Sequence, residues 1–115
     1  MNIQRGLYYE DYEIGSTVKS QGLTVTEADI VNFCGFTGDF SSLHVDREFA
    51  KGIHFKQRIA HGMLTMSMAT GLAVMTGMLE DTIIAFESIA DWQFKRPVFI
   101  GDTVHIEITA VKKEE

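Results

Sequence analysis

A segment without a single charged residue limits the folds that this chain can adopt. It runs from residue 62 to residue 79 and reads GMLTMSMATGLAVMTGML. A helix that is apolar on nearly all sides is either a membrane span or the centre of a water-soluble fold. The segment is at the lower limit of spanning length, and its glycine, serine and threonine residues make it weakly hydrophobic for lipid. We therefore expect a buried central helix and no membrane contact.

The composition is that of an acidic globular domain. The chain has 115 residues, of which 45% are hydrophobic and 23% are charged. Its net charge of −6 argues against nucleic acid as a partner, because phosphate groups are bound by basic faces. A single cysteine, Cys34, allows no internal disulfide, and the first residues lack the pattern of a signal peptide. We therefore expect a cytoplasmic protein.

The first half of the chain predicts one strand and two helical stretches. The strand covers residues 16–25, with an interruption at Gly22. A helix is predicted over residues 26–36, with Thr26 as its N-cap, and Gly38 is expected to end it. Asp46 is a plausible cap for a further helical turn over residues 46–51. Residues 52–60 are expected to form a loop.

The second half predicts two long strands after the central helix. Residues 83–95, IIAFESIADWQFK, alternate between apolar and mostly polar side chains, and residues 103–113, TVHIEITAVKK, do the same. The intervening RPVFIGD has the proline and glycine of a turn. A curved antiparallel sheet around the central helix would bury both apolar faces. We therefore expect an α+β fold.

Such a sheet would cover the helix incompletely. Three strands span roughly 10–14 Å, whereas a helix of this length measures about 27 Å. Either another subunit completes the sheet, or this chain lacks C-terminal strands. We expect a single domain over residues 1–115 that is short at its C-terminus and that forms a homodimer or a larger homo-oligomer.

The motif FTGDFSSLHVD, residues 36–46, is the strongest indication of a functional site. It places Asp39 and His44 five residues apart, close enough to share one water molecule or one substrate atom. Taken alone, Asp39 is an ordinary turn residue and His44 a capping or packing histidine. Metal binding is not expected, because the spacings of the histidines do not suit a zinc site and no cysteine pair assists them. These histidines are His44, His54, His61 and His105.

Together with AHGM and RPVFIGDTV, this motif resembles the MaoC-like dehydratases, the (R)-specific enoyl-CoA hydratases of the hydratase 2 family. Their motif has Gly-Asp, a variable residue, Asn-Pro, an apolar residue and His. The chain matches it at Gly38, Asp39, Phe40, Leu43 and His44, with Ser41 and Ser42 in place of Asn-Pro. The resemblance implies a hot-dog fold, in which a curved antiparallel sheet wraps a long central helix.

The resemblance also implies an activity. Asp39 and His44 would act on one water molecule and add it across the C2–C3 double bond of a trans-2-enoyl thioester, or catalyse the reverse dehydration. The reaction needs a base and an acid. Histidine, with a pKa of about 6.5, suits either role, whereas aspartate is an acid only if burial or a like charge raises its pKa. The amide of Gly62, at the start of the central helix, is expected to face the thioester oxygen.

The substrate would be an acyl-CoA or an acyl-carrier thioester, with no separate cofactor. The residues expected to line it are Ser41, Phe40, Leu43, His61 and Met63. Of these, His61 fits a structural role better than a catalytic one. Two alternatives remain open at this point. One is a hot-dog thioesterase, in which the carboxylate directs water to the carbonyl carbon, and the other is a non-catalytic acyl-thioester-binding protein, which the Ser41-Ser42 replacement motivates.

Overall fold

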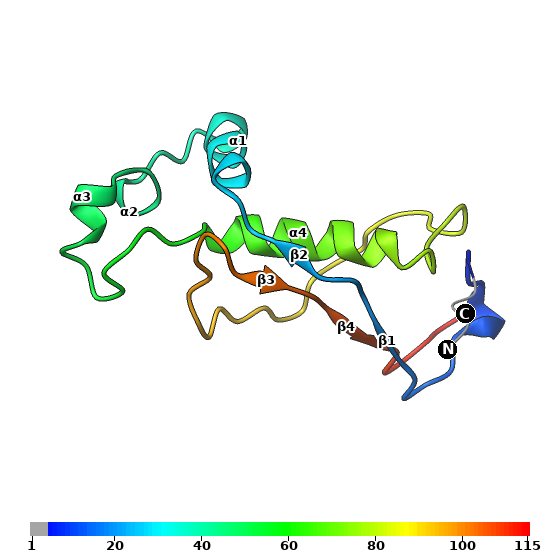
Figure 1. The fold of residues 1–115 in the computed structure, drawn as a ribbon. Helices are drawn as coiled ribbons and strands as arrows, with labels where there is room; N and C mark the ends of the chain where they lie inside the picture. Colours follow the sequence, from blue (N-terminus) through cyan, green and yellow to red (C-terminus); the bar gives the residue numbers. More distant parts are fainter. Residues whose placement is uncertain (1–4) are drawn as a thin grey trace. The chain divides into compact units, whose positions relative to one another are not determined.

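The computed structural model describes residues 5–115, in which one helix is much longer than the strands (Figure 1). The helical elements are η1 (Tyr9–Asp11), α1 (Glu27–Thr37), α2 (Ser42–Val45), α3 (Arg47–Ala50) and α4 (Gly62–Met75). The strands are β1 (Thr17–Lys19), β2 (Leu23–Thr24), β3 (Thr103–Val104) and β4 (Glu107–Thr109). The mixture of helices and antiparallel strands confirms the predicted α+β class. Within these residues, no helix has the length and apolarity that crossing a membrane requires.

The chain forms two compact units. Unit 1 contains residues 5–22, 69–91 and 105–115, and unit 2 contains residues 23–68 and 92–104. In unit 1, β1 pairs antiparallel with β4, with Thr17 opposite Thr109. In unit 2, β2 pairs antiparallel with β3, with Leu23 opposite Val104. The strand predicted over residues 16–25 is therefore present as β1 and β2, with the interruption at Gly22 as expected.

The core of unit 2 forms around α1. Its N-cap is Thr26, whose hydroxyl accepts the amide of Asp29, while the Asp29 carboxylate accepts the amide of Thr26. The helix ends at Gly38, which has the left-handed φ of 79° that favours glycine. These features confirm the predicted helix and both of its ends. The buried core residues are Val25, Ile30, Cys34, Ala60 and Leu64, with Phe33, Met68 and Val98 packed against them.

The segment after α4 differs from its prediction. Residues 83–95 form no strand, although their side chains alternate as a strand requires. A strand exists only where another strand satisfies its backbone groups, and alternation along one segment supplies no such partner. The second predicted strand is present in part. It is broken into β3 and β4, and its alternation is confirmed, since Ile106 and Ile108 are partly buried while Glu107 is exposed.

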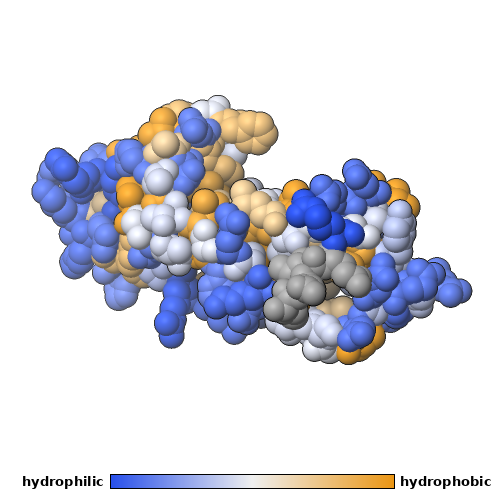
Figure 2. Space-filling model, turned by 45° about the vertical axis from the view of Figure 1, so that its right-hand side comes forward, coloured by the Kyte–Doolittle hydropathy of each residue, from blue (hydrophilic) through white to orange (hydrophobic). Residues whose placement is uncertain are grey.

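The central helix is shorter and less covered than predicted. It ends at Met75 rather than residue 79, and the chain turns at Gly77, which has a φ of 82°. Leu64 and Leu72 are buried, but Met63, Val74 and Met75 are more than half exposed. Hydrophobic patches are also visible among the hydrophilic residues on the face drawn in Figure 2. The predicted wrapping sheet is therefore open in this chain, with two separate two-stranded sheets.

Candidate active site

The loop between α1 and α2 carries the predicted aspartate. The left-handed Gly38 ends α1, and the hydroxyl of Thr37 accepts the amide of Asp39 at 3.1 Å. Asp39 is exposed to solvent. The following single turn, α2, was missed by sequence reasoning, because four residues are too few to show a helical period. This turn presents His44.

Asp39 is held as a carboxylate. Its Oδ1 accepts the hydroxyl of Ser41 at 2.6 Å and the amide of Ser41 at 3.2 Å. These hydrogen bonds, with smaller contributions from the nearby imidazoles, lower the pKa of Asp39 below its usual range. The condition under which Asp39 would act as an acid, a raised pKa, is therefore not met. The Ser41 that stands where the related motif has asparagine contacts this carboxylate directly.

The imidazole of His44 has one nitrogen engaged. Its Nδ1 lies 2.7 Å from the carbonyl oxygen of Ile59, and a carbonyl only accepts, so Nδ1 carries the proton. Its Nε2 has no hydrogen-bond partner within residues 5–115. The carbonyl of His44 itself accepts Nε of Arg58 at 2.6 Å, and the guanidinium of Arg58 also binds both carboxylate oxygens of Glu27, at 2.8 and 3.0 Å. The ring and the backbone of His44 are thus both fixed.

Asp39, His44 and His61 form one cluster. Each offers a side-chain nitrogen or oxygen, and these atoms all lie within 4.8 Å of one another. The rings of His44 and His61 are stacked, with centroids 3.8 Å apart and planes inclined by 25°. His61 was predicted to line the substrate, but it is only 2% exposed. His61 is therefore buried, and it contacts the pair that was predicted from the motif.

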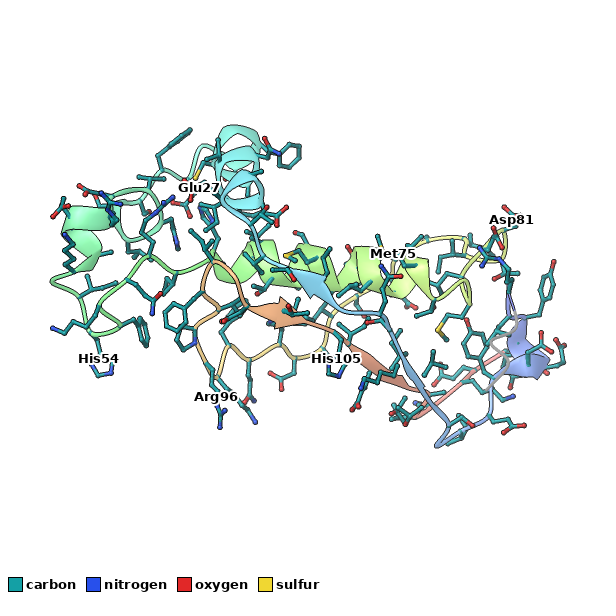
Figure 3. All side chains as sticks on the ribbon, viewed as in Figure 1. Glu27, His54, Met75, Asp81, Arg96 and His105 are labelled. Atoms are coloured by element: carbon teal, nitrogen blue, oxygen red, sulfur yellow. The ribbon has the colours of Figure 1, made fainter. Side chains whose placement is uncertain are left out.

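The arrangement of the two rings does not suit a bound metal ion. A carboxylate and two histidines are suitable ligand types. However, the lone pair of an imidazole lies in the plane of its ring, and nearly parallel rings 3.8 Å apart do not converge on one ion at about 2.0 Å. His54 lies on the loop after α3 and does not belong to the cluster (Figure 3).

Gly62 begins α4 directly after His61. Within residues 5–115 its amide has no hydrogen-bond acceptor, as expected for the first turn of a helix. The ring of Phe94 lies 3.0 Å from the position that a Cβ on residue 62 would occupy. A cavity of about 290 Å³ borders this helix start. Its lining consists of Phe55, Ile59, Ala60, Gly62, Thr65 and residues 94–98.

The other predicted substrate residues are distributed around the cluster. Phe40 is 60% exposed and Met63 is 56% exposed, whereas Leu43 is partly buried and its carbonyl accepts the amide of Ile59. Their contact with a substrate remains a prediction. The contacts of Arg58 were not predicted from the sequence. No spacing rule connects Arg58 with Glu27, 31 positions earlier.

Comparison with known proteins identifies a family that this chain is similar to. The family model "MaoC like domain" matches residues 11–115. The protein MaoC of Klebsiella aerogenes is 35% identical over 106 residues, which cover 92% of this chain and 31% of that protein. An (R)-specific enoyl-CoA hydratase of Rhodospirillum rubrum is 35% identical over 102 residues, covering 89% of this chain and 68% of that protein.

A solved structure is also similar to this chain. The (R)-hydratase of A. caviae involved in PHA biosynthesis has a TM-score of 0.76 and 30% identity, over 92% of this chain and 77% of that one. This chain is thus shorter than its relatives and spans less than a third of the length of MaoC. Because the family model covers nearly all of it and the (R)-hydratase has the same architecture, the chain belongs to the MaoC-like domain family and has its hot-dog fold.

Proposed function

We propose that this protein is a hydro-lyase that hydrates trans-2-enoyl thioesters to (R)-3-hydroxyacyl thioesters, or catalyses the reverse dehydration. The observation that carries the proposal is the cluster in which the Asp39 carboxylate lies beside the imidazole of His44, whose Nε2 is free. Relatives named (R)-specific enoyl-CoA hydratase and 3-hydroxybutyryl-CoA dehydratase support the reaction class. The (R) configuration comes from the names of these relatives.

The lowered pKa of Asp39 supports a role as base rather than as acid for this residue. In hydration, the carboxylate takes a proton from the water whose oxygen bonds to C3. The π electrons of the double bond move toward the thioester, and the amide of Gly62 stabilises the negative charge on its oxygen. Nε2–H of a protonated His44 then delivers a proton to C2. Asp39 returns its proton to His44 through solvent, so the catalyst is regenerated and one water is consumed.

The proposal is tested with purified protein and a series of trans-2-enoyl-CoA substrates of increasing acyl length. Hydration removes the ultraviolet absorbance of the conjugated thioester without release of free thiol. Chiral analysis of the product should give the (R) alcohol. Release of free thiol would instead indicate the alternative thioesterase, and binding without turnover would indicate a non-catalytic acyl-thioester-binding protein. The same assay with acyl-carrier thioesters decides between the two carriers.

We also propose that the protein works as a homodimer. The support is the apolar surface left uncovered in the single chain, where Ile84 is 99% exposed and Phe86 is 70% exposed. Contiguous exposed apolar surface is typical of regions that bind another protein. Light scattering coupled to size exclusion should give twice the mass of the chain, and a monomer at micromolar concentration would contradict this.

A further inference from the structure

His61 makes more contacts with the candidate pair than its place outside the motif would suggest. Its Nε2 lies 3.0 Å from the backbone carbonyl oxygen of Asp39, and its ring stacks on that of His44 at 3.8 Å. It therefore contacts both members of the pair, although neither contact uses the carboxylate of Asp39 or Nε2 of His44. The contacts hold the two residues in place and leave their reactive atoms free.

The hydrogen bonds fix opposite proton positions on the two rings. A carbonyl oxygen accepts only, so Nε2 of His61 carries a proton, whereas in His44 the protonated atom is Nδ1. The Nδ1 of His61 is then an acceptor, and it is buried without a partner among the described residues. An unsatisfied buried polar atom requires an explanation. In His61 the ring is oriented so that Nε2–H points at the Asp39 carbonyl, and this orientation leaves Nδ1 without a partner among the described residues.

The surroundings of His61 hold its ring in place. From α1, the ring of Phe33 lies against it with centroids 4.8 Å apart, and the thiol of Cys34 lies 3.5 Å from its Nε2. Burial raises the pKa of the Cys34 thiol, so this thiol is uncharged. His61 is thus packed against α1 on one side and against the His44 ring on another.

We propose that His61 is a positioning residue that anchors the Asp39 loop through Nε2–H and supports the His44 ring by stacking. This inference rests on the proposed function, because it describes how the same pair is aligned. It also makes a statement about proton positions that does not depend on turnover. His61 is therefore not a second acid or base, even though it belongs to the cluster.

The proton positions are tested by nitrogen-15 NMR of the histidine rings in the wild-type protein, assigned with His61→Gln. We expect the neutral His61 ring to carry its proton on Nε2, because this atom lies against a carbonyl oxygen. The neutral His44 ring should have its proton on Nδ1. A neutral His61 ring that carries its proton on Nδ1 would overturn the proposal whether or not the protein proves to be a hydratase.

Two matched amides test the positioning role. The amide nitrogen of glutamine lies as many bonds from Cβ as Nε2 of histidine, whereas that of asparagine corresponds to Nδ1. His61→Gln keeps the donor to the Asp39 carbonyl, so kcat should stay within about tenfold of wild type. His61→Asn loses it, and the resulting displacement of Asp39 should lower kcat about a hundredfold. Thermal unfolding of both variants provides the control for folding.

Equal activity of the two amide variants would overturn the anchoring role of Nε2–H. Rescue by glutamine but not by asparagine supports it, because a merely structural defect would not distinguish donors at these two positions. If the wild-type protein hydrates no enoyl thioester, the proposed function fails, and the proton positions measured by NMR still decide the inference about His61.

Discussion

Two regions of this chain carry equally clear sequence patterns, but only one of them folds as its pattern indicates. The region from Thr26 to Gly62 contains the predicted caps, turns and helices, and it brings Asp39 and His44 together. The segment at residues 83–95 has regular apolar alternation and yet forms no strand. Its Ile84 is almost fully exposed, whereas Ile30 on α1 is fully buried.

The difference lies in where each pattern finds its partners. A capping box or a glycine C-cap is satisfied by backbone groups within a few residues, so the local sequence is sufficient. A strand is satisfied only by another strand, and its apolar face only by something that covers it. Local contacts therefore specify the helix ends of the site region, whereas residues 83–95 need a long-range partner to become a strand.

The largest expected effect tests the site region. His44→Asn places an amide nitrogen where Nδ1 was, so it keeps the donor to the Ile59 carbonyl but removes Nε2. Loss of a positioned acid or base should lower kcat by about 10²–10⁴. Steady-state kinetics measures this, and an unchanged melting temperature shows that the fold is intact. A kcat within threefold of wild type would show that His44 has no role in the chemistry.

The next prediction compares how much a side chain from each region contributes to the free energy of unfolding. Ile30→Ala removes a fully buried side chain and should lower the free energy of unfolding by about 2–5 kcal/mol. Ile84→Ala removes a side chain that is 99% exposed, and the change should stay within about 0.5 kcal/mol. Urea denaturation at protein concentrations low enough for the proposed dimer to dissociate measures both. If Ile84→Ala then costs as much as Ile30→Ala, the 83–95 segment is covered within the single chain and the contrast between the regions is wrong.

A smaller effect is expected from changing Arg58, which donates a hydrogen bond to the His44 carbonyl. Arg58→Met keeps most of the apolar stem but loses the bonds to Glu27 and to the His44 carbonyl, with Arg58 only 16% exposed. We expect a loss of about 1–2 kcal/mol of unfolding free energy and a reduced kcat, because the turn that carries His44 is loosened. The control is Lys51→Met, which breaks an exposed pair with Glu48 and should cost about 0–0.5 kcal/mol. If the two variants lose the same free energy of unfolding, the Arg58 contacts stabilise the fold no more than an exposed ion pair does.

The smallest effect concerns the charge state of Asp39. Ser41→Ala removes the hydroxyl that does most to lower the pKa of Asp39, so this pKa should rise toward the ordinary carboxyl value. The acid limb of the kcat/KM profile should then move to higher pH, because the base is protonated earlier as pH falls. Ser42→Ala, which leaves Asp39 untouched, is the matched control. An acid limb that stays in place would show that Asp39 is not the titrating base.

The same shift has a consequence for stability. The pKa of Asp39 is lower in the folded protein than in the unfolded chain, so its contribution is present above the unfolded value. That contribution disappears as pH falls through the folded value. Ser41→Ala should therefore lower the melting temperature slightly at neutral pH and not at strongly acidic pH.

Much of the site region follows from the sequence because its determinants are local or belong to one motif. Thr26, Gly38 and Asp46 were identified as helix signals, and each has that role in the structure. The proximity of Asp39 and His44 followed from their spacing in the motif. The turn α2 did not, because it is too short for periodicity.

The contacts that align Asp39 and His44 could not be predicted from the sequence. Arg58 reaches Glu27 and the His44 carbonyl across the fold, and His61 stacks on a residue 17 positions earlier. No pattern along the chain specifies such pairs. For the same reason, the alternation at residues 83–95 gave a strand prediction that is wrong for the single chain: the pattern describes a covered face but not what covers it.

The central claim is that Asp39 and His44 act as one unit on a single water molecule. A double-mutant cycle of Asp39→Asn and His44→Asn in the hydration assay tests it most directly. If the two residues act together, the double variant should be about as slow as the slower single variant, since either loss alone stops the shared step. If the two effects instead multiply, or if Asp39→Asn keeps wild-type kcat, the two residues do not share a step and the account is contradicted.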